Sequence, residues 1–257
     1  LTGLTVSQCV AAMVADILVG GGAVERMVYG GGSRGRFGQH LCLNRGIEQG
    51  TLVAEEYSSL SMAFRYLAGS LGLPFIPIRS LRGSDILARV QEIAPSEIAY
   101  IDDPFTGDNW LVLKPLVPDV AVVQVQTADE DGNAWILGPR WVNEEQVKAS
   151  ERAILITEHL VSTEVSRREP ERTVLPGFRA SLVVHLPFAA HPTSVYHASD
   201  YDADHIREFA DASKTPEGFR DYLDRYVYGT KDHWEYLELI GGVRHMARLA
   251  ADPVLGY

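Results

Sequence analysis

The sequence predicts an α/β protein with an open, mainly parallel sheet, helices on both faces of that sheet, and a helical C-terminal part. Three observations support this prediction. Short β-branched runs alternate with segments of helical periodicity along most of the chain. Residues 120–125 form a continuous apolar run, which is typical of a strand covered on both faces. From Thr215 onward, helix-capping signals replace strand signals. Strands that alternate with helices favour a parallel sheet.

The N-terminal part alternates strand and helix, and glycine or serine marks most of the boundaries. Ser58 or Ser59 can cap one helix, which Gly72 stops, and Ser84 can begin the next. The predicted elements are a strand at 24–29, a helix at 37–49, a strand at 51–55, a helix to residue 71, a strand at 75–78 and a helix at 84–92.

The C-terminal part begins with a hairpin and ends in helices. Thr215 caps a helix that has Pro216 at its first position and ends at Gly229, and Thr230 can cap the next helix. The other predicted elements are a hairpin at 100–113 that turns at 106–109, strands at 120–125, 153–157 and 182–186, and a helix at 144–151. We expect residues 1–257 to form a single domain. The first ten residues resemble the interior of a domain, so we also expect the natural protein to continue before Leu1.

Composition and charge restrict the classes of function. The 257 residues are 46% hydrophobic and 22% charged, as is usual for a globular protein. The net charge of -11 disfavours nucleic acid and anionic membranes as partners. It also means that an anionic cofactor needs a local basic pocket or help from a partner. Cys9 and Cys42 are expected to be reduced, in a cytoplasmic protein without a membrane span.

The glycine-rich turn after the first predicted strand permits several interpretations. Gly30, Gly32 and Gly35 have the spacing of a dinucleotide-binding fingerprint, and Glu55 follows about 20 residues later. A basic, loose turn argues against that interpretation. A substrate-facing loop, with Ser33 as its candidate hydroxyl, and a plain turn are the two alternatives.

Two adjacent carboxylates end the next predicted strand. Because successive strand residues point to opposite faces, we expect one of Glu55 and Glu56 to face solvent and the other a crevice. The neighbouring Tyr57 and Ser58 favour Glu56 for the crevice. A carboxylate enclosed by apolar residues can serve as a general acid or base.

Polar side chains at later strand ends have both a structural and a binding interpretation. Arg79 can bind a substrate carboxylate in a bidentate fork or pair with an internal aspartate, and Ser84 can bind substrate or cap a helix. Gln126, with Gln124 on the same face, can satisfy the backbone or donate to a ligand. His191 lies in a loop, where a histidine is either a surface or a site residue. The spacing of His197, Asp202 and His205 matches no standard zinc site, so no metal is predicted.

Several segments resemble the α subunit of family I CoA-transferases, glutaconate CoA-transferase most closely, and the resemblance spans nearly the whole chain. These segments are Leu1-Thr2-Gly3-Leu4, Gly72-Leu73-Pro74-Phe75-Ile76-Pro77, Tyr100-Ile101-Asp102-Asp103-Pro104-Phe105, Pro118-Asp119-Val120-Ala121, Ala190-His191-Pro192, Asp200-Tyr201-Asp202, Ser213-Lys214-Thr215, Lys231-Asp232-His233 and Glu235-Tyr236-Leu237.

The resemblance implies an αβ or α2β2 enzyme whose active site lies between this chain and a homologous β subunit. In such transferases a β-subunit glutamate attacks the acyl-CoA and forms a glutamyl-CoA thioester. This chain lacks that glutamate-glycine motif, so alone it should be inactive. The family also includes the α subunits of steroid-degrading CoA-thioester hydrolases and of a decarboxylase. Glu56 of this sequence aligns with an acidic position of the hydrolase α subunits.

Glu56 is therefore the candidate catalytic residue of this chain. The candidate substrate-binding residues around it are Ser33, Arg79, Ser84, Gln126 and His191. The sequence assigns no residue to CoA itself. It leaves open whether the complex transfers CoA, hydrolyses a thioester or cleaves a carbon–carbon bond, and it keeps a dinucleotide-binding protein as an outside alternative.

Overall fold

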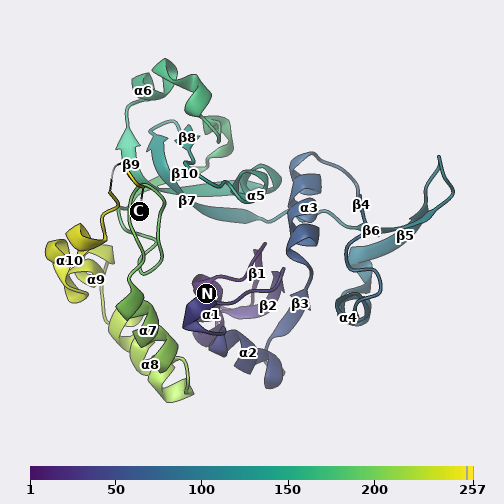
Figure 1. Cartoon of the computed structure of the whole chain (residues 1–257), viewed down its shortest axis with the longest axis horizontal. Helices are drawn as coiled ribbons and strands as arrows, with labels where there is room; N and C mark the ends of the chain where they lie inside the picture. The colour runs from purple at the N-terminus through teal and green to yellow at the C-terminus, as the bar shows by residue number, and fades with distance from the viewer. Residues whose placement is uncertain (253, 257) are drawn as a thin grey trace. The chain divides into compact units, whose positions relative to one another are not determined.

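A computed structural model of the chain describes residues 1–252 and 254–256. The chain divides by its internal packing into two compact units, Leu1–Pro118 and Asp119–Tyr257, where the sequence predicts one domain. Each unit is an arrangement of helices on open sheets (Figure 1). The predicted α/β class, with a parallel sheet and flanking helices, is confirmed.

The first unit contains a parallel three-stranded sheet of β1 (Leu4–Gln8), β2 (Val24–Tyr29) and β3 (Val53–Glu56), in that order. Helices α1 (Met13–Gly20) and α2 (Leu41–Glu48) connect these strands. Ala15 of α1 and Met27 of β2 are fully buried in the same apolar cluster, which fixes the helices on the sheet. The predicted helix at 37–49 is two elements, a 3₁₀ turn at Gly35–Phe37 and α2.

The same unit contains a second, antiparallel sheet in the order β4-β6-β5. Its strands are β4 (Ile76–Ile78), β5 (Ile98–Asp102) and β6 (Asn109–Leu113), and the helices on either side of β4 are α3 (Ser59–Ser70) and α4 (Asp85–Ile93). The predicted hairpin is confirmed, with its turn beginning at Asp103, whose carbonyl accepts the Gly107 N–H. Leu111 and Leu113 of β6 are fully buried, so this sheet has its own apolar face.

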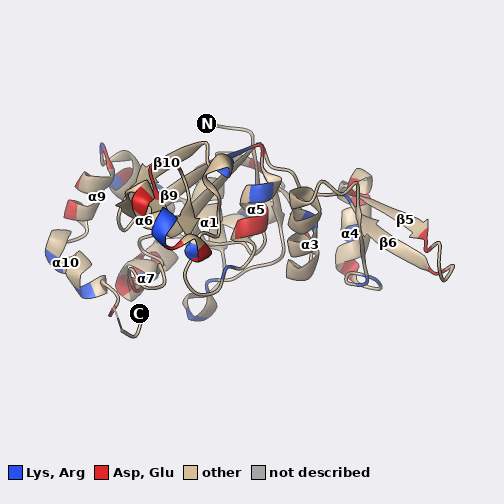
Figure 2. Cartoon of the chain, turned by 90° about the horizontal axis from the view of Figure 1, so that it is seen from above, with Lys and Arg blue, Asp and Glu red and all other residues tan. Residues whose placement is uncertain are grey.

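The second unit is built on a four-stranded sheet in the order β10-β9-β7-β8. Its strands are β7 (Val120–Asp129), β8 (Ala134–Trp135), β9 (Arg152–Val161) and β10 (Leu182–His185). The pairs β7–β9 and β9–β10 are parallel, and β8 turns back antiparallel to β7. Val125 and Leu155 are fully buried in the core between this sheet and α5 (Asn143–Ala149). Acidic and basic side chains are mixed on α5 (Figure 2), where Lys148 pairs with Glu144.

Short helices complete the second unit, as predicted for the end of the chain. They are α6 (Thr163–Arg168), α7 (Ala203–Ala212), α8 (Pro216–Leu223), the π-helical turn Asp224–Tyr228, α9 (His233–Leu239) and α10 (Gly242–Leu249). Thr215 caps α8 as predicted. The prediction of Thr230 as the next cap is wrong, because the Asp232 carboxylate accepts the Glu235 N–H and caps α9. None of the described helices is both long and apolar enough to cross a bilayer.

Candidate functional site

The carboxyl ends of β2 and β3 lie side by side at one edge of the first parallel sheet. Tyr29, the last residue of β2, is in register with Glu56, the last residue of β3. The turn after β2 and the start of α3 therefore meet, and the Ser59 hydroxyl donates to the Gly30 carbonyl at 2.8 Å. The carboxyl edge of parallel strands is where open α/β sheets bind ligands.

The glycine turn that follows β2 is tight because backbone approaches it from two sides. A Cβ on Gly30 would lie 2.3 Å from the Cys9 carbonyl oxygen and 2.7 Å from the Cα of Ser59. A Cβ on Gly32 would lie 2.7 Å from the Ala11 carbonyl oxygen. Packing of the protein on itself thus explains both glycines.

This geometry differs from a dinucleotide fingerprint. In that fingerprint the glycines lead directly into the helix whose N-terminus binds the pyrophosphate. Here Gly35 begins a 3₁₀ turn, and α2 begins only at Leu41. The Ser33 hydroxyl is exposed and accepts the Gly35 N–H at 3.3 Å, which shapes the turn.

Glu55 is a buried structural carboxylate, and the expectation that one of the two glutamates faces solvent is wrong for it. Its side chain accepts the Tyr57 hydroxyl at 2.7 Å and Arg26 at 2.9 Å, and it lies 3.4 Å from Arg65. Only 3% of Glu55 is exposed. The two arginines and the phenol replace water around the charge, which makes burial of the carboxylate tolerable.

Arg65 is the centre of this buried network. It is 1% exposed, donates to the Lys114 carbonyl at 2.9 Å, pairs with Glu97 and lies 4.6 Å from the centroid of the Tyr57 ring. Burial raises the pKa of Tyr57, so its hydroxyl stays protonated and donates to Glu55. The network ties β3 and α3 to the segment that follows β6.

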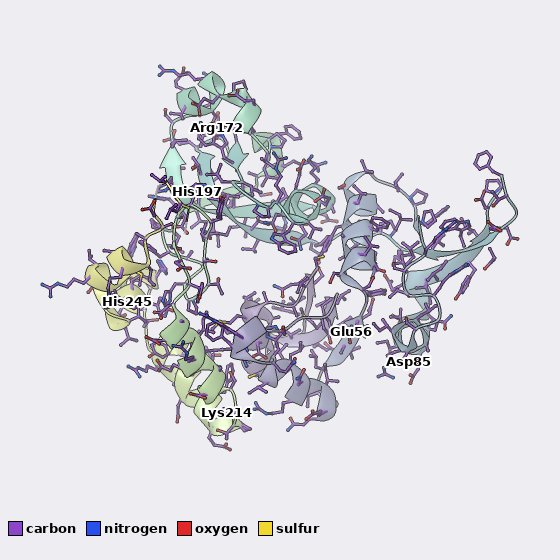
Figure 3. The ribbon with its side chains drawn as sticks, viewed as in Figure 1. Glu56, Asp85, Arg172, His197, Lys214 and His245 are labelled. Carbon is purple, nitrogen blue, oxygen red and sulfur yellow. The ribbon has the colours of Figure 1, made fainter. Side chains whose placement is uncertain are left out.

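Glu56 is half-buried and, as the next residue of β3, lies on the opposite face of the strand from Glu55. Among the described residues its carboxylate has no hydrogen-bonding or ion-pair partner, and it lies near the turn at Gly31. Burial, reinforced by the negative charge of Glu56, raises the pKa of Tyr29 to about 12. Figure 3 labels Glu56 where β3 ends and α3 begins. A half-buried carboxylate without such a partner can contact a ligand.

Two other predicted residues of this unit have structural partners. The Arg79 guanidinium lies 4.7 Å from the centroid of the Trp110 ring. The Ser84 hydroxyl accepts the Leu87 N–H at 3.3 Å and donates to the Leu81 carbonyl, so Ser84 is the N-cap of α4. These contacts leave substrate binding by either residue a prediction.

A chain of three hydroxyl groups near the same sheet edge was missed by the sequence analysis. The hydroxyls of Ser58 and Ser61 are 2.8 Å apart, and those of Ser61 and Ser80 are 2.9 Å apart. Ser58 also caps α3, as predicted for Ser58 or Ser59. The spacing of these serines in the sequence gives no sign that α3 and the end of β4 bring them together.

Gln124 and Gln126 make contacts within the second unit. Gln126 donates to the Tyr196 carbonyl at 3.0 Å and accepts the Leu137 N–H at 3.0 Å, so it satisfies the backbone. Gln124 donates to Glu158 at 2.6 Å. Burial raises the pKa of Glu158, although the hydrogen bond from the Phe188 N–H opposes the rise.

His191 lies in a buried polar cluster of the second unit. Its Nδ1 is 2.6 Å from the Tyr236 hydroxyl, and its Nε2 is 3.2 Å from Asp202. Asp202 caps α7 through the N–H groups of Asp204 and His205. The surface alternative for His191 is therefore wrong, and binding of substrate by His191 stays a prediction.

Comparison with known proteins agrees with the fold and with the resemblance in the sequence. The Coenzyme A transferase family matches residues 4–186, which is more than half of the chain. This chain belongs to that family. It is 31% identical over 255 residues to the α subunit of glutaconate CoA-transferase from Acidaminococcus fermentans, covering 94% of this chain and 79% of that protein.

Structural comparison gives the same relationship for this CoA-transferase chain. The crystal structure of the Acidaminococcus fermentans glutaconate CoA-transferase superposes with a TM-score of 0.94 at 29% identity, over 100% of this chain and 84% of that one. The chain is therefore of the α-subunit type. The crystal structure of a variant of the decarboxylase AibA/AibB superposes with a TM-score of 0.72 at 29% identity, over 87% and 82% of the two chains.

One relative is much longer than this chain. An uncharacterised protein of Archaeoglobus fulgidus is 36% identical over 250 residues, which cover 96% of this chain but 54% of that protein. The CoA-transferase chain thus spans about half the length of this relative and about four fifths of the glutaconate CoA-transferase α chain.

Proposed function

We propose that this chain is the α subunit of a heteromeric cytoplasmic enzyme that moves CoA between carboxylic acids. The observation that carries the proposal is the likeness to the α chain of glutaconate CoA-transferase, which covers 94% of this chain in sequence and all of it in backbone. Because that relative is named as one subunit of a larger enzyme, it supports a homologous β partner, in an αβ or α2β2 complex. The substrates are an acyl-CoA thioester and a free carboxylate.

The transfer needs a carboxylate nucleophile, which we place on the β subunit. One glutamate oxygen bonds to the acyl carbonyl carbon, the C–S bond breaks and the CoA thiolate leaves. The thiolate then attacks the glutamyl carbonyl and releases the first acid. The carboxylate of a second acid then attacks the glutamyl-CoA thioester, and the same two steps run in the opposite direction. CoA leaves as the thioester of the second acid, and the glutamate is regenerated. Burial and ion pairing make Glu55 unsuitable as this nucleophile in the present chain.

The contribution of this chain comes from the sheet edge at Glu56. Glu56 is its candidate general acid or base, because it is the half-buried carboxylate there that has no hydrogen-bonding partner among the described residues. Ser33 is exposed in the neighbouring turn, and although its oxygen accepts the Gly35 N–H, its hydroxyl can still donate to the polar group of the substrate. Arg79, Ser84, Gln126 and His191 stay candidates of second rank because each already has a structural partner.

Hydrolysis or decarboxylation of a CoA-linked substrate is the second candidate function. The observation that favours it is the likeness to the decarboxylase AibA/AibB, at nearly the same identity as to the transferase. The two functions differ in the partner: a nucleophilic glutamate on the β subunit favours transfer, and its replacement favours the alternative.

The test is to co-express the chain with its neighbouring β gene and treat the purified complex with acyl-CoA. In a transferase, hydroxylamine converts the glutamyl-CoA thioester into a hydroxamate that mass spectrometry locates on a β-subunit glutamate. A complex that consumes acyl-CoA without this adduct supports hydrolysis or decarboxylation. An active monomer without a partner would contradict the subunit assignment.

A further inference from the structure

Three side chains that could ligate a metal converge in the second unit. They come from the loop after β10, from the N-cap of α7 and from α10, and they are His191, Asp202 and His245. Asp202 Oδ2 lies 3.2 Å from His191 Nε2 and 2.5 Å from His245 Nε2. One ligand atom from each residue lies within 4.8 Å of the other two. Figure 3 labels His245 on α10.

We infer that His191, Asp202 and His245 form a site for a divalent transition metal of the Zn²⁺ class. Two imidazole nitrogens and one carboxylate oxygen are a donor set that suits Zn²⁺ and Co²⁺. A set of three protein ligands leaves a coordination position for water. The side chains of His191 and Asp202 are 4% and 8% exposed and that of His245 is 21% exposed, so the ion reaches the site from the His245 side.

The outer contacts of two ligands have the arrangement that metal sites use to orient their ligands. Asp202 Oδ1 is held by the N–H groups of Asp204 and His205, which leaves Oδ2 for the ion. The Tyr236 hydroxyl is 2.6 Å from His191 Nδ1 and can accept a hydrogen bond from the Nδ1–H group that is present when Nε2 binds a metal.

Several contacts must change when the ion binds. The hydrogen bonds of His191 and His245 to Asp202 give way to bonds to the ion, and the contact of His245 with Arg248 changes as well. Arg248 lies 3.0 Å from His245 Nδ1. A guanidinium only donates, so without metal His245 carries its proton on Nε2 and donates it to Asp202. Metal on Nε2 moves the proton to Nδ1, and Arg248, which is exposed, turns into solvent. The cluster without metal is thus a closed hydrogen-bonded form of the same site.

The experiment titrates the chelator-treated full chain with Co²⁺, followed by its visible absorption, and then displaces Co²⁺ with Zn²⁺. One equivalent should bind with the intense bands of four- or five-coordinate cobalt. Tyr236→Phe, which removes an outer contact, should weaken binding by about 10–100-fold, and His245→Gln by at least as much. Asp202→Asn, which keeps an oxygen to cap α7, should also weaken binding.

His197→Gln is the matched control, because it removes an exposed histidine of the same unit. It should bind Co²⁺ as the wild type does, and circular dichroism should show that the variants are folded. No saturable binding to the wild type, or equal binding by folded His245→Gln, would overturn the site. The readout needs neither the β partner nor acyl-CoA, so its failure is distinguishable from failure of the proposed function.

Discussion

Glu55 and Glu56 are adjacent in the sequence and have different environments because successive residues of β3 point to opposite faces. The sequence predicts this opposition, and it favours Glu56 for the crevice. It could not predict that Glu55 is buried, because Arg26 and Arg65 reach it from β2 and α3. Pairing between distant residues is set by packing, and no local pattern records it.

The two glutamates should therefore respond differently to neutralisation. In the reconstituted complex, Glu56→Gln should lower kcat by about 10²–10⁴-fold, the usual effect of losing a general acid or base. Glu55→Gln should destabilise the chain by about 3 kcal/mol, because it leaves buried Arg65 with less negative charge. Turnover and urea midpoints measure the two effects.

The control for Glu55→Gln is Glu92→Gln, which removes an exposed partner of Arg89. It should change stability by less than about 1 kcal/mol. Wild-type turnover in Glu56→Gln, or a stability loss in Glu92→Gln equal to that in Glu55→Gln, would contradict the roles assigned here.

The Glu158 carboxyl group predicts how the stability of the folded chain depends on pH. Its pKa is raised in the folded chain, so between the unfolded and folded pKa values the native state binds more protons than the unfolded state. Stability then falls as pH rises through this window, and is highest below it. Glu158→Gln should abolish this loss, since Gln124 can turn its amide and keep the hydrogen bond. Urea unfolding from pH 4.5 upward measures the slope, and an unchanged slope in the variant refutes the assignment.

Other site residues show how much of the candidate site the sequence predicts. Ser84 and Gln126 had both a structural and a binding interpretation, and the structure gives each the structural partners. His245 was missed, because it lies 43 residues from Asp202 and only the packing of α10 brings it close. Local roles such as helix capping can be predicted from the spacing of residues in the sequence. Clusters that several elements bring together cannot be predicted in this way.

At the scale of elements, the turn between β2 and α2 depends on close backbone packing. Gly30→Ala should cost roughly 3 kcal/mol, because its Cβ would meet backbone atoms of Cys9 and Ser59 that cannot rotate away. Gly50→Ala is the control, since its left-handed φ of +68° costs about 1 kcal/mol but nothing lies within 4 Å of the new Cβ. Equal losses in thermal unfolding would show that contact with the backbone of Cys9 and Ser59 is unimportant.

Variants of Ser84, the N-cap of α4, can distinguish a capping role from a substrate-binding role. Ser84→Ala should destabilise the chain by about 1 kcal/mol, and Ser84→Asp should restore most of that loss, because aspartate also caps. If the hydroxyl only caps, both variants keep the KM of the wild-type complex. A KM that rises in both variants while Ser84→Asp is stable would instead assign Ser84 to substrate binding.

The elements that the sequence predicts well are those with local signals. Residues 24–29 and the caps Ser58, Ser84 and Thr215 are as predicted. The strand β1 was not predicted, because its parallel pairing with β2 depends on a partner distant in sequence. The predicted strand at 120–125 extends to Asp129, since β9 supplies hydrogen bonds beyond the apolar run.

At the scale of the whole molecule, the net charge of -11 should affect the proposed binding of CoA, because CoA is itself anionic. Basic and acidic residues are interspersed along the ribbon in Figure 2. A chain of this charge repels an anionic ligand at low ionic strength, and a partner can supply the missing positive field. If the proposed β subunit supplies that field, it contributes electrostatics in addition to the proposed nucleophile.

We therefore expect the isolated chain to bind CoA much more weakly than the complex does. Calorimetric titration of CoA into each should show saturable binding only for the complex. Salt supplies the internal control, because screening shortens the Debye length from about 10 Å at 0.1 M to about 3 Å at 1 M. If repulsion by the chain limits binding, salt should strengthen its weak interaction with CoA and weaken that of the complex. Tight, salt-sensitive binding by the isolated chain would show that it carries its own basic pocket, and the β subunit would then be needed for the nucleophile alone.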